Sequence, residues 1–242
     1  MLERPQYLES IHRALRNNPV VMLLGARQVG KSTLARQLLQ RDDVNYLDLE
    51  LPGPTALLQE PYTNLKDRRG LVVIDEAQRQ PELFPVLRVL ADRARTPARF
   101  LLLGSASPEL SRQANESLAG RVAFIDVGGF STEEVGLKKV DRLWLRGGFP
   151  RSFLATSEAL SLEWRQRFIR TFIERDLGVL GFGYPPPAMI RFWTLLAHYH
   201  GQIWNAAEAA ANMGVTARTV NRYLDALEQT FMIRRVLPWY EN

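Results

Sequence analysis

The 242-residue sequence predicts an α/β protein with a parallel sheet in its first half and a helical second half. Two observations carry this prediction. Short apolar runs alternate with amphipathic segments as far as about residue 127, which is typical of a parallel sheet with crossover helices on both faces. From about residue 139 onward, strand-like runs are missing until the last residues. The chain is therefore expected to change architecture near its middle.

Five apolar runs are expected to form the strands of the sheet. Each is rich in Val, Leu or Ile and is bounded by polar or Gly-containing segments, as buried parallel strands are. The segments between them place apolar residues at helical spacing and are expected to be helices. The expected strands are 19–24, 44–47, 71–75, 100–104 and 122–127, and the clearest helical segments between them are 59–68, 85–93 and 108–118.

Directly after the first expected strand, the chain reads Gly-Ala-Arg-Gln-Val-Gly-Lys-Ser, which matches the pattern Gly-x-x-x-x-Gly-Lys-Ser/Thr. An apolar run precedes the match and a helical pattern follows it, and this is the context that the pattern requires. Its glycines let successive backbone N–H groups face a phosphate at a helix N-terminus. We therefore expect Lys31 to contact the β- and γ-phosphates of a nucleotide and Ser32 to ligate Mg²⁺. The residues expected to bind the nucleotide are Gly25, Ala26, Arg27, Gln28, Val29, Gly30, Lys31, Ser32 and Thr33.

Two acids, Asp75 and Glu76, end the third expected strand. Strands often end in acids, so the pair alone is weak evidence, but here it follows the phosphate-binding loop by about 45 residues. A carboxylate at that edge of the sheet is suited to hold the metal, and its neighbour is suited to take a proton from water. We expect Asp75 to ligate Mg²⁺ and Glu76 to act as general base.

Ser105 and Arg121 flank the last two expected strands. If the strand before Ser105 lies next to the phosphate-binding loop, this hydroxyl is placed to sense the γ-phosphate or the attacking water. The alternative is a polar strand end that caps the next helix. Arg121 precedes the last strand and is expected to lie too far from its own nucleotide, but within reach of a neighbouring subunit's. That is the role of an arginine finger in trans, and a plain surface Arg is the alternative.

Together these motifs resemble those of the AAA+ superfamily of P-loop ATPases, and more narrowly the prokaryotic AAA_14 type. The resemblance covers about residues 1–240. It implies a sheet order of 5-1-4-3-2, the use of ATP and Mg²⁺, and a homo-oligomer in the form of a hexameric ring or a spiral. The strings that carry it are Gly-Ala-Arg-Gln-Val-Gly-Lys-Ser (25–32), Val-Val-Ile-Asp-Glu-Ala-Gln (72–78), Leu-Leu-Gly-Ser (102–105), Leu-Ala-Gly-Arg (118–121), Gly-Gly-Phe-Pro (147–150) and Ile-Glu-Arg-Asp-Leu (173–177).

Two features depart from that family. Many members carry Asn or Thr where this chain has Ser105, and relatives commonly continue into a nuclease-like domain that the sequence lacks. The chain is therefore expected to be either a short member of the family or a shortened one. The family's second phosphate sensor is usually an Arg of the helical segment, and the resemblance leaves Arg146 and Arg175 as candidates.

The last quarter of the chain predicts a winged helix-turn-helix. Helical patterns over 188–200, 205–211 and 217–230 are expected, with a tight turn at 214–216 and a short strand over 231–237 as the wing. With the Pro-rich linker at 185–187, the expected domains are an ATPase core (1–139), a helical lid (140–187) and a winged helix (188–242). A purely packing role for this last module is the alternative to DNA contact. The residues expected to contact DNA are Arg218, Thr219, Asn221, Arg222, Arg234 and Arg235.

The overall charge is compatible with a polyanionic partner. The net charge is +5, and 27 of the 31 basic residues are Arg, which suits phosphate contact, although base composition or heat adaptation explains it equally well. The chain has no Cys, no signal segment and no apolar run of membrane length, so a cytoplasmic protein is expected.

The function expected from these observations is a Mg²⁺-dependent ATPase that acts as an oligomeric DNA-binding or DNA-remodelling motor, with helicase-like action as one form. The alternative is a regulatory signalling ATPase in which ATP switches assembly or partner binding without movement along DNA.

Overall fold

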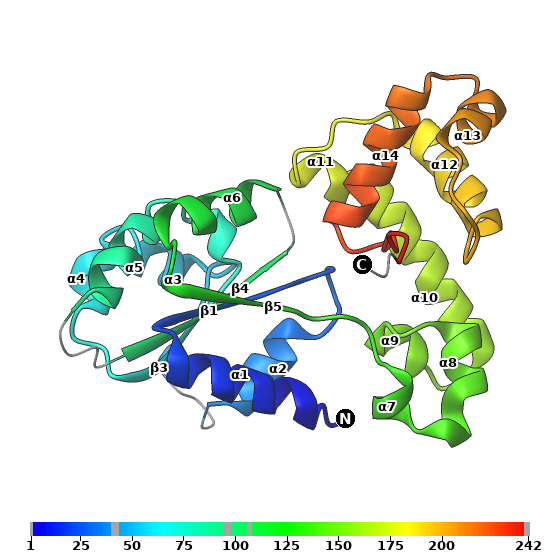
Figure 1. The fold of residues 1–242 in the computed structure, drawn as a ribbon. Coiled ribbons are helices and arrows are strands. Elements are labelled where there is room, and N and C mark those ends of the chain that lie inside the picture. Colours follow the sequence, from blue (N-terminus) through cyan, green and yellow to red (C-terminus); the bar gives the residue numbers. More distant parts are fainter. Residues whose placement is uncertain (1, 40–43, 94–97, 106–107, 240–242) are drawn as a thin grey trace. The chain divides into compact units, whose positions relative to one another are not determined.

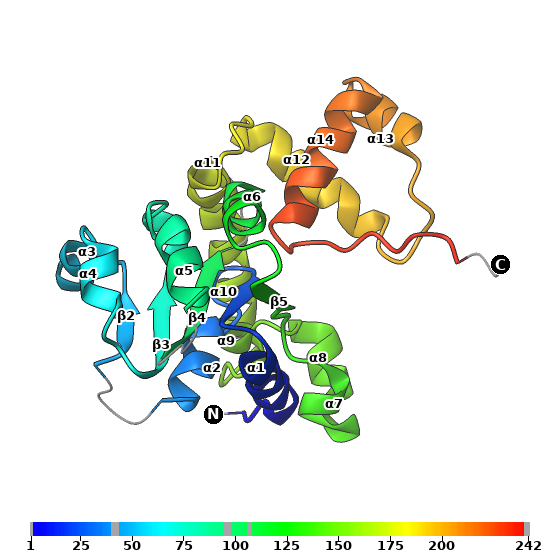
Figure 2. The ribbon, with the colours of Figure 1, turned by 60° about the vertical axis from the view of Figure 1, so that its left-hand side comes forward.

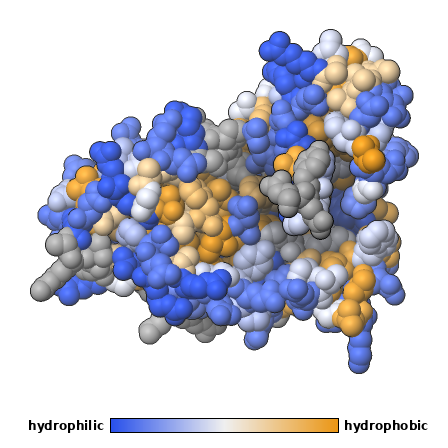
Figure 3. Space-filling view, viewed as in Figure 1, coloured by the Kyte–Doolittle hydropathy of each residue, from blue (hydrophilic) through white to orange (hydrophobic). Residues whose placement is uncertain are grey.

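The computed structural model describes residues 2–39, 44–93, 98–105 and 108–239. The chain divides into two compact units, Met1–Thr156 and Ser157–Asn242. Within the described ranges, no helix has the length and apolar character needed to cross a membrane. Hydrophilic residues cover most of the face shown in Figure 3, with apolar patches scattered among them.

Five parallel strands form the sheet of the first unit, in the order β2-β3-β4-β1-β5 (Figure 1). Read from the other edge, this is the expected order 5-1-4-3-2, so the fold class is confirmed. Each expected strand is present with its ends within two residues of the prediction. The strands are β1 (Val20–Gly25), β2 (Tyr46–Asp48), β3 (Gly70–Asp75), β4 (Ala98–Ser105) and β5 (Val122–Asp126).

Helices cover both faces of the sheet. α1 (Pro5–Asn17) and α2 (Lys31–Gln37) lie on one face, and α5 (Leu83–Ala91) and α6 (Pro108–Ser117) lie on the other (Figures 1 and 2). α5 buries four apolar side chains at helical spacing, which explains its packing against the sheet. Between β2 and β4 lie α3 (Pro52–Leu57), α4 (Pro61–Leu65) and the 3₁₀ turn η1 (Ala77–Arg79).

The segment after β5 belongs to the same compact unit as the sheet. Its helices pack on a small core formed by Phe130, Val135 and Phe153, against which Leu2 and Leu143 also pack. Unit 1 thus extends to Thr156, inside the region 140–187 expected to form a lid. The three-part division of the chain stays a prediction. The elements of this segment are α7 (Thr132–Val135), η2 (Leu137–Lys139), α8 (Val140–Arg146) and α9 (Pro150–Phe153).

The second unit is helical. Its α12 (Pro186–His198), α13 (Ala206–Met213) and α14 (Ala217–Gln229) pack together, as both ribbon views show (Figures 1 and 2). Gly214 adopts a left-handed φ of 69° between α13 and α14, and the Thr216 side chain caps α14, so the predicted tight turn is present. The preceding elements are α10 (Glu158–Thr171), a π-helical turn η3 (Phe172–Asp176) and α11 (Leu177–Val179).

The prediction of a strand over 231–237 is wrong. Residues 231–239 form no strand, and the backbone N–H groups of Met232 and Ile233 instead donate to the carbonyl of Leu227. A strand needs a partner for its backbone groups, and an isolated two-stranded hairpin is at best marginally stable. The side chain of Arg235 pairs with Asp225 and Glu228 of α14, which holds this segment to the helix. Arg234 and Arg235 therefore do not lie in a β-wing.

Candidate nucleotide site

The phosphate-binding loop joins β1 to α2, and its backbone has conformations that glycine favours. A Cβ at Gly25 would lie 2.3 Å from the carbonyl oxygen of Val127, so no larger residue fits there. Gly30 has a φ of 104°, and Gln28 between them is also left-handed with a φ of 62°. These dihedrals curl the chain at the N-terminus of α2, where backbone N–H groups have no partner within the helix.

Lys31 is buried at the centre of this loop, with 7% of its surface exposed. Its Nζ donates to the carbonyls of Gly25 and Ala26 at 2.8 and 2.9 Å. Burial lowers the pKa of Lys31 to about 8, although the nearby Glu76 and Asp75 carboxylates act to raise it. A buried cation whose hydrogen bonds go to neutral carbonyls is well suited to a polyanionic ligand. The next residue, Ser32, is half-buried, and Thr33 is exposed.

Ser105 lies beside the phosphate-binding loop. β4 pairs with β1 so that Ser105 stands opposite Gly25, and only 3% of Ser105 is exposed. Ser105 therefore lies next to the loop, as a residue that senses the γ-phosphate must. The role itself stays a prediction.

Asp75 ends β3 with its carboxylate held from two sides. Its Oδ2 accepts a hydrogen bond from the Tyr46 hydroxyl at 2.5 Å, and its Oδ1 accepts one from the backbone N–H of Glu76 at 3.0 Å. Burial and the hydrogen bond to Asp75 raise the pKa of Tyr46. The guanidinium of Arg36, on α2, lies 4.9 Å from the centre of the Tyr46 ring. Sequence reasoning missed Tyr46, because only the pairing of β2 with β3 brings it to Asp75.

Glu76 follows with a left-handed φ of 57°. The side-chain amide of Gln78 donates a hydrogen bond to its Oε2. Burial raises the pKa of Glu76, and the negative charge of Asp75 adds to this, while the Gln78 hydrogen bond and the Lys31 charge oppose it. A carboxylate with a raised pKa is a better proton acceptor, so the environment of Glu76 is suited to a general base.

These groups fit ATP and Mg²⁺. The curled loop offers backbone donors for phosphate oxygens, and Lys31 brings a desolvated positive charge to the same place. The carboxylate oxygens of Asp75 and the hydroxyl of Ser32 are the hard oxygen ligands that Mg²⁺ takes. The structure thus brings together the loop, Asp75, Glu76 and Ser105 at one edge of the sheet.

The Gly-Gly-Phe-Pro motif at residues 147–150 lies against the phosphate-binding loop, a role that sequence reasoning missed. A Cβ at Gly30 would lie 3.8 Å from Cγ of Pro150, the first residue of α9. The preceding Gly148 packs directly on the segment after β5, since its carbonyl accepts from Phe130 N–H at 2.7 Å and a Cβ at Gly129 would lie 2.8 Å from its backbone. The Gly-Gly-Phe-Pro string was noted only as a family signature. Here it holds α9 against the phosphate-binding loop.

Arg121 lies at the opposite edge of the sheet from the loop. Its carbonyl accepts from Val20 N–H, at the start of β1, whereas the loop follows the end of that strand. Six strand residues separate the two edges by about 17 Å. The Arg121 guanidinium forms a two-point ion pair with the Asp92 carboxylate, at 2.5 and 2.9 Å, which lowers the pKa of Asp92. Contact with a neighbouring subunit's nucleotide stays a prediction.

The two candidates for a second phosphate sensor differ in their surroundings. Arg146 is buried, and its guanidinium donates to the carbonyls of Phe153 and Ala155 at the end of α9. Arg175 lies in the π-helical turn of the second unit, where it pairs with the buried Asp176 at 3.0 Å. Arg146 thus has a structural task in unit 1, and neither assignment as a sensor is tested.

The predicted DNA-contact residues lie on two different segments. Arg218, Asn221 and Arg222 are exposed on the first two turns of α14, at the spacing of one helical face. Thr219 is half-buried, and its N–H donates to the side chain of Thr216, so it contributes to the cap. Arg234 is exposed, and Arg235 is paired with two acids, as described above.

Comparison with known proteins divides the chain in two. Residues 17–136 match the AAA_14 family, described as an AAA domain, and residues 137–242 match DUF8612, a domain of unknown function. The uncharacterized proteins Rv2008c of Mycobacterium tuberculosis and Mb2031c of Mycobacterium bovis are each 48% identical to the chain over all 242 residues. The chain spans 55% of the length of each. The Walker-type ATPase paby2304 of Pyrococcus abyssi has a similar fold, with a TM-score of 0.61 and 18% identity over 95% of this chain and 90% of that one.

Proposed function

We propose that the chain, whose residues 17–136 match the AAA_14 family, is a P-loop ATPase that hydrolyses ATP with Mg²⁺ and acts on DNA as an oligomeric motor. One observation carries the proposal of hydrolysis. A glycine-shaped loop, the buried Lys31 and the acid pair Asp75 and Glu76 converge at the carboxyl edge of one sheet. Phosphate binding alone needs the loop and the lysine, but not a second acid in a desolvated position beside them.

Each residue has a defined task in this proposal. The loop N–H groups and Lys31 bind and orient the phosphates, and Asp75 and Ser32 hold Mg²⁺, which neutralises phosphate charge when bound. Glu76 accepts a proton from the attacking water at its carboxylate, and burial of the site excludes other water. Ser105, opposite Gly25, hydrogen-bonds at the γ-phosphate side of the loop.

The DNA part of the proposal rests on charge. The chain carries +5 overall, and Arg218, Asn221 and Arg222 form an exposed face at the start of α14, where helix-turn-helix proteins read DNA. The proposal also includes a homo-oligomer, because Arg121 lies one strand length from its own loop and would have to leave Asp92 to act as a finger on a neighbouring subunit's nucleotide.

One observation favours the alternative, an ATP-dependent switch without DNA movement. The segment expected as a basic wing forms no strand, and the charge of Arg235 is matched by Asp225 and Glu228. A helix-turn-helix with a smaller basic surface is suited to packing on a partner as well as to gripping a duplex.

ATP turnover measured with and without DNA tests the proposal. We expect wild-type turnover to rise several-fold with at least one of single-stranded, duplex or forked DNA. Lys31→Ala removes the phosphate cation and should abolish turnover. Glu76→Gln should bind a fluorescent ATP analogue normally but turn over about 10²–10⁴-fold more slowly, since the amide cannot take the proton. Glu82→Gln changes an exposed acid at the start of α5 and serves as the matched control.

The outcomes separate the parts of the proposal. Turnover that no DNA stimulates favours the switch, provided Lys31→Ala still abolishes it. Normal turnover in Glu76→Gln shows that the base is another group. A wild-type protein that neither binds nor hydrolyses ATP contradicts the whole proposal.

A further inference from the structure

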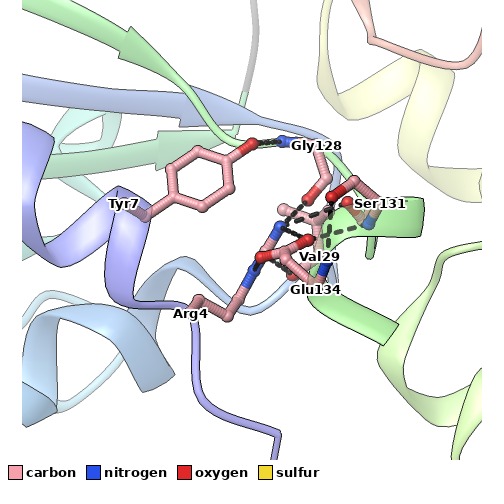
Figure 4. A network of polar contacts seen from close by, with 7 residues as sticks. Arg4, Tyr7, Val29, Gly128, Ser131 and Glu134 are labelled. Carbon is pink, nitrogen blue, oxygen red and sulfur yellow. Dashed lines mark hydrogen bonds and ion pairs between the residues drawn. The ribbon is translucent and has the colours of Figure 1, made fainter. Parts of the chain in front are cut away.

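Arg4, just before α1, contacts two segments that are far from it in the sequence, the phosphate-binding loop and residues 128–134 (Figure 4). Its Nε and one terminal nitrogen donate to the two carboxylate oxygens of Glu134 at 2.5 and 3.2 Å. Its guanidinium also donates to the carbonyls of Gly128 at 2.9 Å, Gly129 at 3.1 Å and Val29 at 3.4 Å. Val29 belongs to the phosphate-binding loop, so the hydrogen bonds of Arg4 reach the backbone of the candidate nucleotide site.

Stability alone is a poor reason for this arrangement. The side chains of Arg4 and Glu134 are each only 5% exposed, and buried ion pairs rarely stabilise a protein more than apolar residues of similar size. An apolar side chain, however, cannot direct a carbonyl group. The guanidinium has five N–H donors in one plane, and here it orients carbonyls from two segments at once.

The Val29 carbonyl is the contact that matters for the nucleotide. It belongs to the peptide group that joins Val29 to Gly30, and in a planar trans peptide the C=O and N–H point in opposite directions. When Arg4 holds this carbonyl on the outer side of the loop, the Gly30 N–H points to the inner side, where phosphate oxygens bind. Gly30 has a left-handed φ of 104° and is the N-cap of α2, so the Val29–Gly30 peptide lies just outside the helix.

The same network reaches the segment that leads away from the sheet. Glu134 also accepts from Ser131 N–H at 2.8 Å in the capping box of α7, and the Tyr7 hydroxyl accepts from Gly128 N–H at 3.0 Å (Figure 4). The rings of Tyr7 and Phe130 lie 4.4 and 5.3 Å from the Arg4 guanidinium. The loop and residues 128–134 are therefore held by one side chain.

From these contacts we propose that Arg4 is a positioning residue of the phosphate-binding loop. It orients the Val29–Gly30 peptide toward the phosphates and couples the loop to residues 128–134, and Glu134 holds Arg4 in place. This inference rests on the proposed function, because it requires the loop to bind a nucleotide. Coupling is reciprocal, so nucleotide binding should in turn restrain residues 128–134.

Two variants of the pair test this idea. Arg4→Lys keeps the charge beside Glu134 but loses the planar fork that reaches several carbonyls. The double variant Arg4→Met with Glu134→Met removes both charges together and leaves no unpaired buried ion, at the cost of the Glu134 acceptor in the capping box of α7. Arg13→Lys, on an exposed part of α1, and Glu133→Gln, next to Glu134 but exposed, are the matched controls.

The main readout is the affinity for a fluorescent ADP analogue, measured well below the unfolding temperature, with inorganic pyrophosphate as competitor. We expect both test variants to bind ADP and pyrophosphate about tenfold more weakly, as for the loss of one oriented hydrogen bond to a charged group. The affinities for ADP and for pyrophosphate should fall by the same factor, because the Val29–Gly30 peptide contacts the phosphates and not the base. The controls should match wild type.

Hydrogen exchange of residues 128–134 is the second readout. In wild type, ADP should slow exchange in this segment, and in both test variants this nucleotide-dependent protection should be lost. A folded double variant with wild-type affinity and protection would show that Arg4 is only structural and would overturn the inference. If wild type binds ADP but Lys31→Ala also does, the proposed nucleotide site fails, and the inference with it.

Discussion

The nucleotide site and the exposed face of α14 differ in how their residues are held. In the nucleotide site, Lys31, Asp75 and Ser105 are all less than 8% exposed. Lys31 donates hydrogen bonds to loop carbonyls, and Asp75 accepts one from the Tyr46 hydroxyl. On α14, Arg218 and Arg222 are exposed to solvent. Chemistry on a phosphate needs desolvated groups at fixed positions, whereas contact with a nucleic-acid backbone needs mainly positive charge. The comparison explains why a nucleotide site follows a strict motif, whereas the proposed DNA contact on α14 requires none.

The largest expected effect would contradict this comparison, because it concerns Arg121, a half-buried residue outside the nucleotide site. Arg121→Ala should bind ATP but hydrolyse it about 10³–10⁵-fold more slowly, as expected for the loss of an arginine finger. Mixtures of Arg121→Ala with Lys31→Ala subunits should regain part of the turnover, because one subunit supplies the site and the other the finger. Arg112→Ala, which is likewise an Arg paired with an acid, is the control. Mixtures that co-assemble without recovery would show that Arg121 acts within its own subunit or only structurally.

Tyr46→Phe sharpens the comparison inside the buried site. It removes the hydroxyl that donates to Asp75 and that also contacts the Arg36 side chain, so the Mg²⁺ concentration at half-maximal turnover should rise about 10–100-fold. Binding of the ATP analogue in the absence of Mg²⁺ should not change. Tyr62→Phe, whose ring is largely exposed and contacts Arg93, is the control. A Mg²⁺ dependence that stays at the wild-type value would mean that Asp75 needs no such support.

The pH dependence of nucleotide binding tests the burial of Lys31. Its pKa in the folded protein is about 8 against 10.5 for an ordinary lysine, so Lys31 is charged below pH 8 and loses its proton as the pH rises above it. Because phosphates bind the charged form, affinity should be level below pH 8 and fall by up to about tenfold per pH unit above it. Residual binding by Lys31→Arg should not follow this curve, since arginine stays charged. Wild-type affinity that is level to pH 9.5 would contradict the assignment.

The smallest effect concerns the exposed face. Arg218→Ala with Arg222→Ala should weaken DNA binding and reduce the slope of log affinity against log salt by about one per residue. Turnover without DNA should match wild type. Fluorescence anisotropy over a salt series measures both quantities, and Arg191→Ala, exposed on α12, is the control. An unchanged slope would show that Arg218 and Arg222 do not contact DNA phosphates.

Local patterns account for what the sequence predicted well. The five strands and the loop between β1 and α2 depend on short apolar runs and on glycines at fixed spacing, and these features act over a few residues. Asp75 and Glu76 could be placed because parallel strands bring their carboxyl ends to one edge. The wing was wrongly predicted, because an apolar run over 231–237 shows strand propensity but does not show whether a partner strand exists.

By itself, the sequence determined the fold class, the phosphate-binding loop and the identity of the buried lysine and acids, since each depends on neighbours along the chain. Only the tertiary structure decided which distant groups meet. It placed Ser105 opposite Gly25, Tyr46 on Asp75, Arg121 on Asp92, and Arg4 between Val29 and Glu134. These contacts depend on the order of the strands and on the direction of each side chain, and residues 25 to 130 positions apart carry no local signal of their meeting.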